Sequence, residues 1–359
     1  MKIVGKRNEI LNGIQTVQSV VSTRINLPIL SNILLEAEDS NLNLIASDLE
    51  MFVRKEVDVE VIRSGRIIIP ARKFYEIING LQDQDVIIEI DKDDAIISCG
   101  RSIFNIPKLD PTEFPKFPIL QRDISFTLPF ISFKNMIKKT IFATSTDKIR
   151  YTLNGILFIL NKGCITMVAT DGYRLSFVKY NLEDIEQGLN LSIIIPTKVL
   201  NELNKTLNRD EIEVVINKKQ IGFFINNTIL ISRLIEGNFP DYKKVIPKNQ
   251  NKIEVKKEDL LDACRRVSII NQDILKFSLQ KDNLIITANS EIGGVKEEIG
   301  ILFNSPPIDI GFNPKYLIDV LKNIESREVI IELNDSLNPI LLRPSTLEDY
   351  FFVVMPMRI

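Results

Sequence analysis

The chain has 359 residues, of which 45% are hydrophobic and 26% are charged, and its net charge at neutral pH is −2. This length exceeds one ordinary hydrophobic core and fits three domains of about 120 residues each. The chain contains no histidine, which excludes Ser-His-Asp and Cys-His catalytic sites and zinc sites that use histidine. A catalytic site built from Asp, Glu, Lys or Tyr stays open on composition alone.

Cysteine usage and hydropathy indicate a cytoplasmic protein. Cys99, Cys164 and Cys264 are far apart and form no C-x-x-C pair, which is typical of reduced thiols. No stretch approaches the roughly 20 apolar residues of a membrane span. The N-terminal residues lack the apolar run of a signal peptide. We expect no metal site, no cofactor and no membrane partner.

Each third of the chain opens with an amphipathic helix followed by a strand. The apolar residues of these helices recur at spacings that place them on one face. The predicted helices are Glu9–Ser22, Phe133–Thr144 and Glu258–Ile270. The predicted strands that follow them are Asn32–Ala37, Asn154–Leu160 and Lys276–Leu279.

A repeated proline motif marks the second half of each third. Ile67–Pro70 and Ile193–Pro196 both read Ile-Ile-Ile-Pro, Ile310–Pro314 is a looser copy, and the prolines are 126 and 118 residues apart. This period is that of a small domain. A helix pattern follows each proline, which suits a first helical turn, and a strand pattern comes next. The predicted strands are Val86–Ile90, Ile212–Ile216 and Val329–Leu333.

Two helices and several strands per repeat predict an α+β fold of three tandem similar domains, with boundaries at 1–119, 124–247 and 248–359. Two segments rich in proline and aromatic residues, Leu109–Pro118 and Phe239–Pro247, are interpreted as extended linkers packed on a surface.

The apolar end of the chain, Phe351–Ile359, has two interpretations. Its alternation allows a buried strand through about Val354, whereas Pro356 cannot easily continue one because it lacks a backbone donor. Exposed methionines would instead suit an adaptable peptide-binding groove. The pattern alone leaves both open.

Basic residues recur at matched positions in the repeats. Lys198 and Lys205 lie at +2 and +9 from their repeat proline, and Lys315 and Lys322 at +1 and +8. A separation of seven residues is two helical turns, so each pair shares a helix face. A solvated face explains any one pair. Recurrence favours a surface that contacts the phosphate backbone of duplex DNA, without base reading.

One polar segment, Thr170–Leu175, could suggest a catalytic site. Polar turn residues recur at the corresponding places in the other repeats, Ser47–Glu50 and Asn289–Glu291. We therefore interpret Asp171 as a turn residue. The residues Tyr173-Arg174-Leu175 occur in the second repeat alone, so a function specific to that repeat is expected there.

Together, six segments resemble the bacterial sliding clamps, the β subunits of DNA polymerase III. They are Leu27–Leu30, Pro70–Phe74, Leu153–Gly155, Thr170–Leu175, Phe239–Tyr242 and Val354–Arg358. The resemblance covers the whole chain. It implies a DNA replication processivity factor without catalytic activity. Such a protein forms a head-to-tail homodimeric ring that encircles double-stranded DNA without sequence specificity. Its implied partners are the DNA polymerase III alpha subunit, the clamp loader, other DNA polymerases and repair proteins.

The resemblance also assigns residues to three surfaces. With the basic helix residues, the DNA-facing set is Arg24, Arg72, Lys73, Lys134, Lys138, Lys148, Arg150, Tyr151, Lys198, Lys205, Arg265, Lys315 and Lys322. The implied peptide-binding pocket comprises Leu153, Thr170, Gly172, Tyr173, Arg174, Leu175, Pro240, Lys244, Val245, Val353, Val354, Met355, Pro356 and Met357. The implied dimer interface contains Arg101, Phe104, Ile269, Ile270 and Glu298.

Three substitutions relative to the family pattern matter. Tyr173 stands where relatives commonly have histidine, and Lys244 replaces an arginine and loses its planar, bidentate geometry. Both predict an altered preference at the pocket rim. Asp147 places an acid where it would face phosphate. Two alternatives remain: an enzyme with a carboxylate–lysine site, which predicts one unrepeated polar cluster that the sequence does not show, and a scaffold for protein partners alone.

Overall fold

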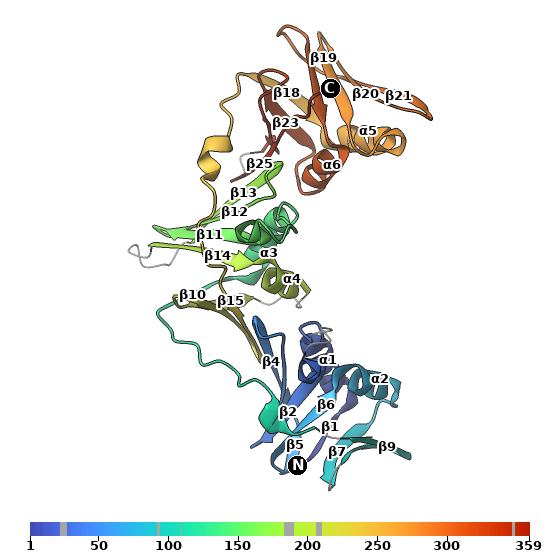
Figure 1. Ribbon diagram of the computed structural model, residues 1–359, viewed down its shortest axis with the longest axis vertical. Helices are drawn as coiled ribbons and strands as arrows, with labels where there is room; N and C mark the ends of the chain where they lie inside the picture. The colour runs from blue at the N-terminus through green and yellow to red at the C-terminus, as the bar shows by residue number, and fades with distance from the viewer. Residues whose placement is uncertain (22–26, 92–93, 108, 183–189, 206–209, 347–348) are drawn as a thin grey trace. The chain divides into compact units, whose positions relative to one another are not determined.

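The computed structural model describes residues 1–21, 27–91, 94–107, 109–182, 190–205, 210–346 and 349–359 (Figure 1). Each of the three repeats consists of two similar halves, and each half contains a strand, a helix and three further strands. The first repeat has one additional strand, β5 (Glu60–Arg63). Mixed helices and sheets in three tandem similar units confirm the predicted α+β class.

The halves of the first repeat are as follows. The first half contains β1 (Lys2–Lys6), α1 (Arg7–Gln18), β2 (Asn32–Glu38), β3 (Asn41–Ser47) and β4 (Met51–Asp58). The second half contains β6 (Gly65–Pro70), α2 (Ala71–Gly80), β7 (Asp85–Asp91), β8 (Asp94–Cys99) and β9 (Ser102–Pro107).

The second repeat follows the same order. Its first half contains β10 (Ile124–Pro129), α3 (Phe130–Ile141), β11 (Gly155–Asn161), β12 (Cys164–Thr170) and β13 (Arg174–Asn181). Its second half contains β14 (Asn190–Pro196), α4 (Thr197–Lys205), β15 (Glu211–Ile216), β16 (Gln220–Ile225) and β17 (Thr228–Arg233).

The third repeat completes the series. Its first half contains β18 (Asn251–Lys256), α5 (Lys257–Ile270), β19 (Leu275–Gln280), β20 (Asn283–Ser290) and β21 (Gly293–Gly300). Its second half contains β22 (Ile308–Phe312), α6 (Pro314–Lys322), β23 (Glu328–Leu333), β24 (Ile340–Pro344) and β25 (Tyr350–Val354).

The chain divides into two compact units, and each unit contains two antiparallel sheets. The first unit, Met1–Ile131 with Asn201–Leu234, holds a five-stranded sheet β5-β1-β7-β8-β9 and an eight-stranded sheet β10-β15-β16-β17-β4-β3-β2-β6. The second unit, Ser132–Leu200 with Ile235–Ile359, holds an eight-stranded sheet β14-β11-β12-β13-β25-β24-β23-β18 and a four-stranded sheet β21-β20-β19-β22.

Each eight-stranded sheet joins four strands of one repeat to four strands of the next. In the first unit the junction is the pairing of β17 with β4, which places Leu230 opposite Val53. In the second unit it is the pairing of β13 with β25, which places Phe177 opposite Phe351. At both junctions, the last strand of a repeat's second half pairs with the last strand of the preceding repeat's first half.

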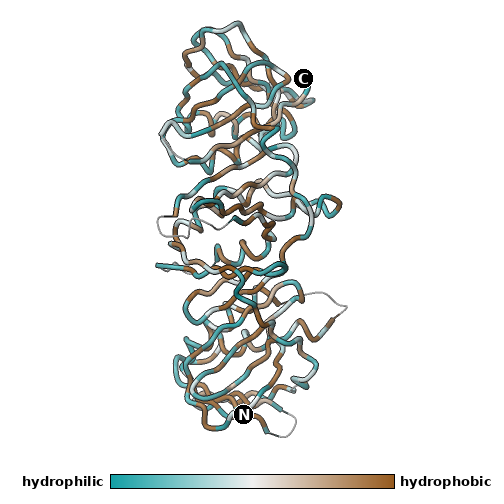
Figure 2. The backbone as a smooth tube through the Cα atoms, turned by 90° about the vertical axis from the view of Figure 1, so that its left-hand side faces the viewer, coloured by the Kyte–Doolittle hydropathy of each residue, from teal (hydrophilic) through white to brown (hydrophobic). Residues whose placement is uncertain are grey.

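The predicted helices are confirmed with shifted ends. The helix that the pattern begins at Phe133 begins at Phe130, whose side chain is fully buried beside the end of β10. The helix expected to reach Ser22 ends at Gln18, because the amides of Val20 and Val21 bond three residues back and tighten the last turn. Figure 2 shows hydrophobic and hydrophilic segments alternating along the backbone.

The third proline lies one position further into its helix than the first two. Pro70 and Pro196 precede α2 and α4, whereas Pro314 is the first residue of α6 and follows the capping Asn313, whose side chain accepts a bond from the Lys315 amide. Lys198 and Lys315 are therefore both second in their helices, as Arg72 is in α2. The three basic residues therefore match more closely by their position in the helix than by their distance from the proline.

Candidate functional site

An apolar cluster lies on one face of the second unit's eight-stranded sheet. Its buried members are Leu157, Val168, Leu175, Phe177, Ile194 and Val353, and its partly buried members are Ile159, Ile235, Phe239, Tyr242 and Phe351. Phe177 and Phe351 stack with ring centroids 4.6 Å apart because the register of β13 and β25 places them opposite each other. Phe239 and Tyr242 come from the second linker, which packs on the sheet as the sequence predicts but is not extended throughout, because Tyr242–Val245 form a 3-10 helix.

Exposed apolar side chains lie close along the chain to residues of this buried floor, and they are called the rim below. Tyr173 is 54% exposed, and Val245, Met355 and Met357 are exposed as well. Lys244 is exposed and pairs with Asp241 at 3.5 Å. A buried apolar floor with an exposed rim of methionine, tyrosine and valine is suited to docking an apolar segment of a partner.

The turn between β12 and β13 fixes the position of Tyr173. Asp171 Oδ1 accepts bonds from the backbone amides of Tyr173, at 2.9 Å, and Arg174, at 3.0 Å. Thr170 Oγ1 donates to the Arg174 carbonyl at 2.6 Å, and Gly172 has a φ of +91°, which favours glycine. The predicted role of Asp171 as a turn residue is confirmed.

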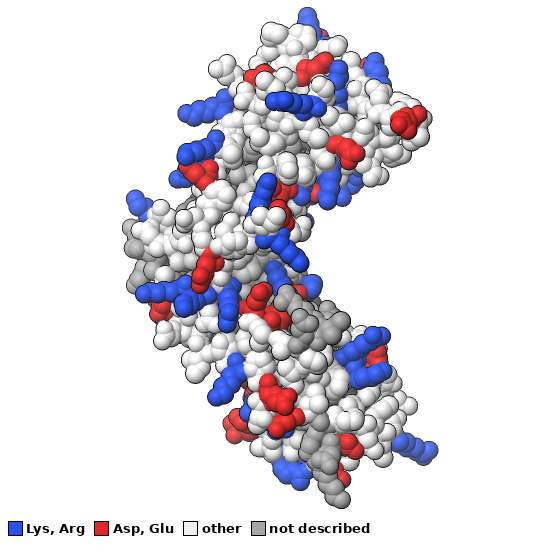
Figure 3. Space-filling model, in the orientation of Figure 1, with Lys and Arg blue, Asp and Glu red and all other residues white. Residues whose placement is uncertain are grey.

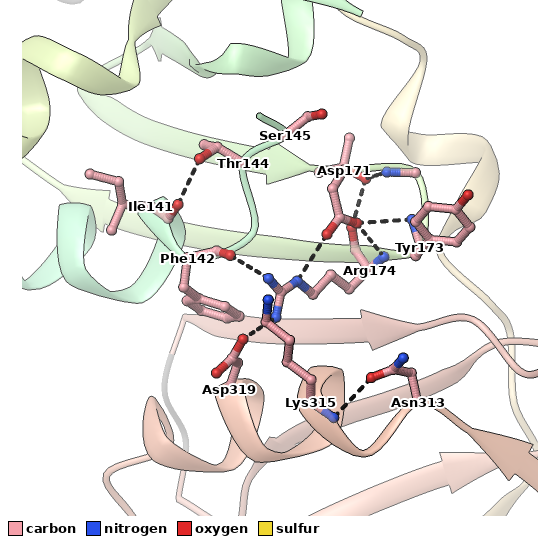
Figure 4. Close-up of polar contacts among 12 residues, drawn as sticks. Ile141, Phe142, Thr144, Ser145, Asp171, Tyr173, Arg174, Asn313, Lys315 and Asp319 are labelled. Carbon is pink, nitrogen blue, oxygen red and sulfur yellow. Dashed lines mark hydrogen bonds and ion pairs between the residues drawn. The ribbon is translucent and has the colours of Figure 1, made fainter. Parts of the chain in front are cut away.

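Arg174 lies on the opposite face of the strand from Leu175. Its side chain is 7% exposed and donates to Asp171 Oδ2 at 3.1 Å, to Asp319 Oδ2 on α6 at 2.7 Å and to the Phe142 carbonyl at 2.7 Å. Figure 4 shows the guanidinium extending toward α6 and Asp319. Arg174 therefore contributes to this region by joining the second and third repeats, while Leu175 contributes to the apolar floor.

The chain's last residues hold the rim to two sheets. The Met355 amide donates to the Tyr173 carbonyl at 2.9 Å, and the Met357 amide donates to the Gly311 carbonyl of β22 at 2.8 Å. A Cβ at Gly311 would come within 2.8 Å of the Met357 carbonyl, so a side chain there would displace the tail where it crosses β22. The interpretation as a buried strand is confirmed through Val354, and an exposed tail follows it, whereas the peptide-binding groove stays a prediction.

An aromatic pair links the rim to α6. The Tyr173 ring stacks on the Tyr316 ring with centroids 6.0 Å apart and planes 15° apart. The Arg174 guanidinium lies 4.9 Å from the Tyr316 centroid. Burial, followed by the nearby Asp171 carboxylate, raises the pKa of Tyr316. Tyr316 and the stacked pair Phe177–Phe351 are absent from the residues that sequence comparison assigns to the pocket.

Alternation along β13 could have identified Phe177. Leu175 and Phe177 are two residues apart on a strand, so they share one face, and a pocket containing Leu175 extends to Phe177. Tyr316 could not be found this way, because its proximity to Tyr173 depends on the packing of α6 against β25.

Many of the expected DNA-facing residues pair with acids on their own helices. Arg72 and Lys73 contact Glu76 at 2.9 Å each, Lys205 contacts Glu202 at 2.8 Å, and Arg265 contacts Asp262 at 3.0 Å. Bonds from Lys73 and then Arg72 lower the pKa of Glu76. These pairs reduce the positive charge of each helix face. Figure 3 likewise shows basic and acidic side chains interspersed on the visible face.

The remaining expected DNA-facing residues fall into three groups. Lys138, Lys148, Lys198, Lys315 and Lys322 are exposed, and Lys134 is half-buried. Arg150 lies beside the β12–β13 turn, because a Cβ at Gly172 would come within 2.8 Å of Arg150 Nη1. Tyr151 lies beside Gly237, where a Cβ would come within 2.9 Å of its hydroxyl. Asp147 accepts a bond from the Ile149 amide at 2.9 Å, which fixes its own turn. Arg24 lies outside the described residues.

The expected interface residues lie at or near two edge strands and at the end of one helix. Phe104 is exposed on β9, the last strand of the five-stranded sheet, and Arg101 is exposed in the turn before it. Ile269 is exposed and Ile270 half-buried at the end of α5. On β21, the last strand of the four-stranded sheet, Glu298 pairs with Lys296 and accepts a bond from Asn283 at 3.1 Å. Bonds from Lys296 and then Asn283 lower the pKa of Glu298.

Within the described residues, no cluster of three or more Cys, Asp or Glu side chains could hold a metal ion. None of the described helices combines the length and apolar character needed to cross a bilayer.

Models of the three domains of the DNA polymerase III beta subunit match this chain in order. The N-terminal domain matches residues 1–118, the central domain 127–241 and the C-terminal domain 243–358. The chain belongs to the DNA polymerase III beta subunit family. The resemblance seen in the sequence is thereby confirmed, and the family is that of the sliding clamps, which are non-catalytic processivity factors of DNA replication.

Individual clamps resemble the chain over its whole length. The beta sliding clamp of Salmonella typhimurium is 33% identical over 100% of both chains, and that of Chlamydia muridarum is 31% identical over 100% of this chain and 99% of its own. The clamp structure from Bacillus subtilis has a TM-score of 0.96 at 30% identity, covering 100% of this chain and 99% of that one. A Pseudomonas aeruginosa clamp bound to griselimycin has a TM-score of 0.95 at 31% identity, with 100% of both chains covered.

Proposed function

We propose that two copies of this chain form a ring that encircles duplex DNA and tethers the replicative polymerase. The observation that carries this proposal is the pattern of sheet junctions. Within each unit, a repeat's second half joins the preceding repeat's first half, through β17–β4 and β25–β13. The equivalent strands β9 and β21 each have a neighbouring strand on one side only among the described residues. Pairing β9 of one copy with β21 of another would complete the same pattern and close the ring.

The hairpins define a register for this proposed junction. Ser102 is the first residue of β9 after its hairpin turn, as Thr228 is the first residue of β17. Gly294 on β21 pairs with Asn289 on β20, as Phe52 on β4 pairs with Ser47 on β3. Phe104 would then lie opposite Val295, as Leu230 lies opposite Val53. Ile269 and Ile270 would pack near Phe104, with Arg101 and Glu298 at the edge of the contact.

The basic helix positions suit weak contact with the DNA backbone. Arg72, Lys198 and Lys315 occupy the same position in α2, α4 and α6, which is the arrangement expected of equivalent domains around a duplex. Pairing of Arg72 with Glu76, of Lys205 with Glu202 and of Arg265 with Asp262 limits the positive charge available to phosphate. A closed ring needs no tight binding, so diffuse contacts without sequence specificity are sufficient.

The apolar cluster would receive partner peptides. Its rim of Tyr173, Val245, Met355 and Met357 suits an extended segment from the DNA polymerase III alpha subunit, the clamp loader, other DNA polymerases or repair proteins. We assign griselimycin, which a Pseudomonas aeruginosa clamp binds, to the same pocket in this chain. The protein would work in the cytoplasm, as three domains within 1–119, 124–247 and 248–359.

Retention on circular DNA tests the ring. Labelled protein is loaded on nicked circular DNA by the clamp loader and ATP, and free protein is removed by gel filtration. We expect the protein to remain with the circle and to be lost within minutes of linearisation. Equal retention on linear and circular DNA would contradict the encircling mechanism and favour a scaffold that binds by contact alone.

A further inference from the structure

The first unit's eight-stranded sheet contains a counterpart of the pocket floor. Because β4 and β17 correspond to β13 and β25, Phe52 and Ile231 correspond to Leu175 and Val353. The neighbouring buried residues are also apolar in both sheets. They are Leu34, Ile45, Ile68 and Phe114 in the first, and Leu157, Val168 and Ile194 in the second, where the partly buried Phe239 packs against them.

The two linkers pack on these floors in the same order. Phe114-Pro115-Lys116-Phe117 in the first linker corresponds to Phe239-Pro240-Asp241-Tyr242 in the second. Phe117 packs edge-on against Phe52, with centroids 5.9 Å apart and the Arg54 guanidinium 5.0 Å from its ring. Tyr242 packs at 6.1 Å from Phe177. Leu120 follows Phe117 by three residues, as Val245 follows Tyr242, so the two residues hold the same position in the linker sequences.

From that position onward the two sites differ. Gly222, which pairs with Ile231, leaves room for Leu120, because an added Cβ there would come within 2.4 Å of Leu120 Cδ2. In the second unit Leu341 takes the place of Gly222 and pairs with Val353. Val245, which follows Tyr242 as Leu120 follows Phe117, remains 44% exposed.

We propose that the first linker occupies a second docking groove from within the chain and that Leu120 keeps this groove closed. This inference rests on the proposed peptide-binding function, because it explains why each chain offers one pocket and not two. Removing the Leu120 side chain would open a groove for the same class of ligand, an apolar peptide segment. Arg54 stands where the pocket has Phe177, so we expect the opened groove to bind more weakly.

Calorimetric titration with griselimycin measures the number of sites per chain. Leu120→Ala removes the occupant, and Gly222→Ala displaces it by adding a Cβ within 2.4 Å of its present position. Ile119→Ala is the matched control, because this neighbouring linker side chain is 93% exposed and its loss leaves the groove filled. Unfolding temperature and solution mass establish that each variant is folded and assembled like the wild type.

We expect one site in the wild type and in Ile119→Ala, and two in Leu120→Ala, the second at least tenfold weaker. If Leu120→Ala and Gly222→Ala both bind the same number of griselimycin molecules per chain as the wild type, the proposal of a closed groove is wrong. The wild-type count tests the proposed function separately. If the wild type binds no griselimycin, the proposed peptide-binding pocket is wrong. An additional griselimycin site in the variants would still support the closed groove.

Discussion

Arg174 Nη1 lies 2.7 Å from Asp319 Oδ2, and this contact joins β13 of the second repeat to α6 of the third. Asp171 binds the same guanidinium at 3.1 Å while it also holds the backbone of the turn that presents Tyr173. The turn that presents Tyr173 and helix α6 are thus both held by the buried Arg174 side chain. The corresponding position in the first unit is Met51, which needs no acidic partner.

We expect Arg174→Met to lower the free energy of unfolding of the second unit by about 3 kcal/mol, because it leaves two carboxylates without their buried partner. Chemical unfolding followed by circular dichroism measures the change. Lys276→Met is the matched control: it removes the exposed pair with Asp309, at 2.9 Å, and should cost less than about 1 kcal/mol. Similar losses in both variants would contradict the structural role of Arg174.

The sequence was sufficient for features that depend on local pattern. Apolar periodicity and the proline motif predict the helices and the threefold repeat, and the Asp171 turn follows from its polar residues. Contacts between repeats were less accessible. The role of Arg174 depends on Asp319, which is 145 residues away, and α6 must be packed before the two meet. Nor does spacing reveal that Leu120 rests on Gly222, because that contact depends on strand register and on the path of the linker.

The C-terminal tail gives a second test, at Gly311. We expect Gly311→Ala to displace Ile359 and Met357, because the added Cβ would lie within 2.6 Å of Ile359 Cγ2 and 2.8 Å of the Met357 carbonyl. Griselimycin affinity should fall about tenfold through the misplaced methionine rim. Gly80→Ala, where a Cβ meets nothing within 4 Å, should bind like the wild type. Unchanged affinity in Gly311→Ala would mean that the tail does not shape the pocket.

The proposed ring junction predicts a variant that separates the subunits. Phe104→Asp places a charge at the centre of the β9–β21 contact, and we expect the dimer dissociation constant to rise at least 100-fold. Sedimentation at several protein concentrations measures it. Ile62→Asp is the control, since Ile62 is exposed on β5, at the opposite edge of the same sheet. Dissociation by both variants, or by neither, would argue against pairing through β9.

Cys264 predicts how stability depends on alkaline pH. Complete burial raises the pKa of this α5 thiol from 9.0 to about 12, so the folded protein retains a proton that the unfolded chain loses above about pH 9. Stability from this group is fully present below pH 9 and decreases as the pH rises toward 12, by up to about 4 kcal/mol. We expect urea unfolding between pH 8 and pH 10.5 to show a shallower decline in Cys264→Ala than in the wild type. The packing lost with the sulfur is independent of pH, so the difference in slope reports the titration of the thiol alone.

Cys164→Ala, at a half-buried site, controls for removal of a thiol. Parallel slopes in the wild type and Cys264→Ala would show that burial does not hold the proton on Cys264.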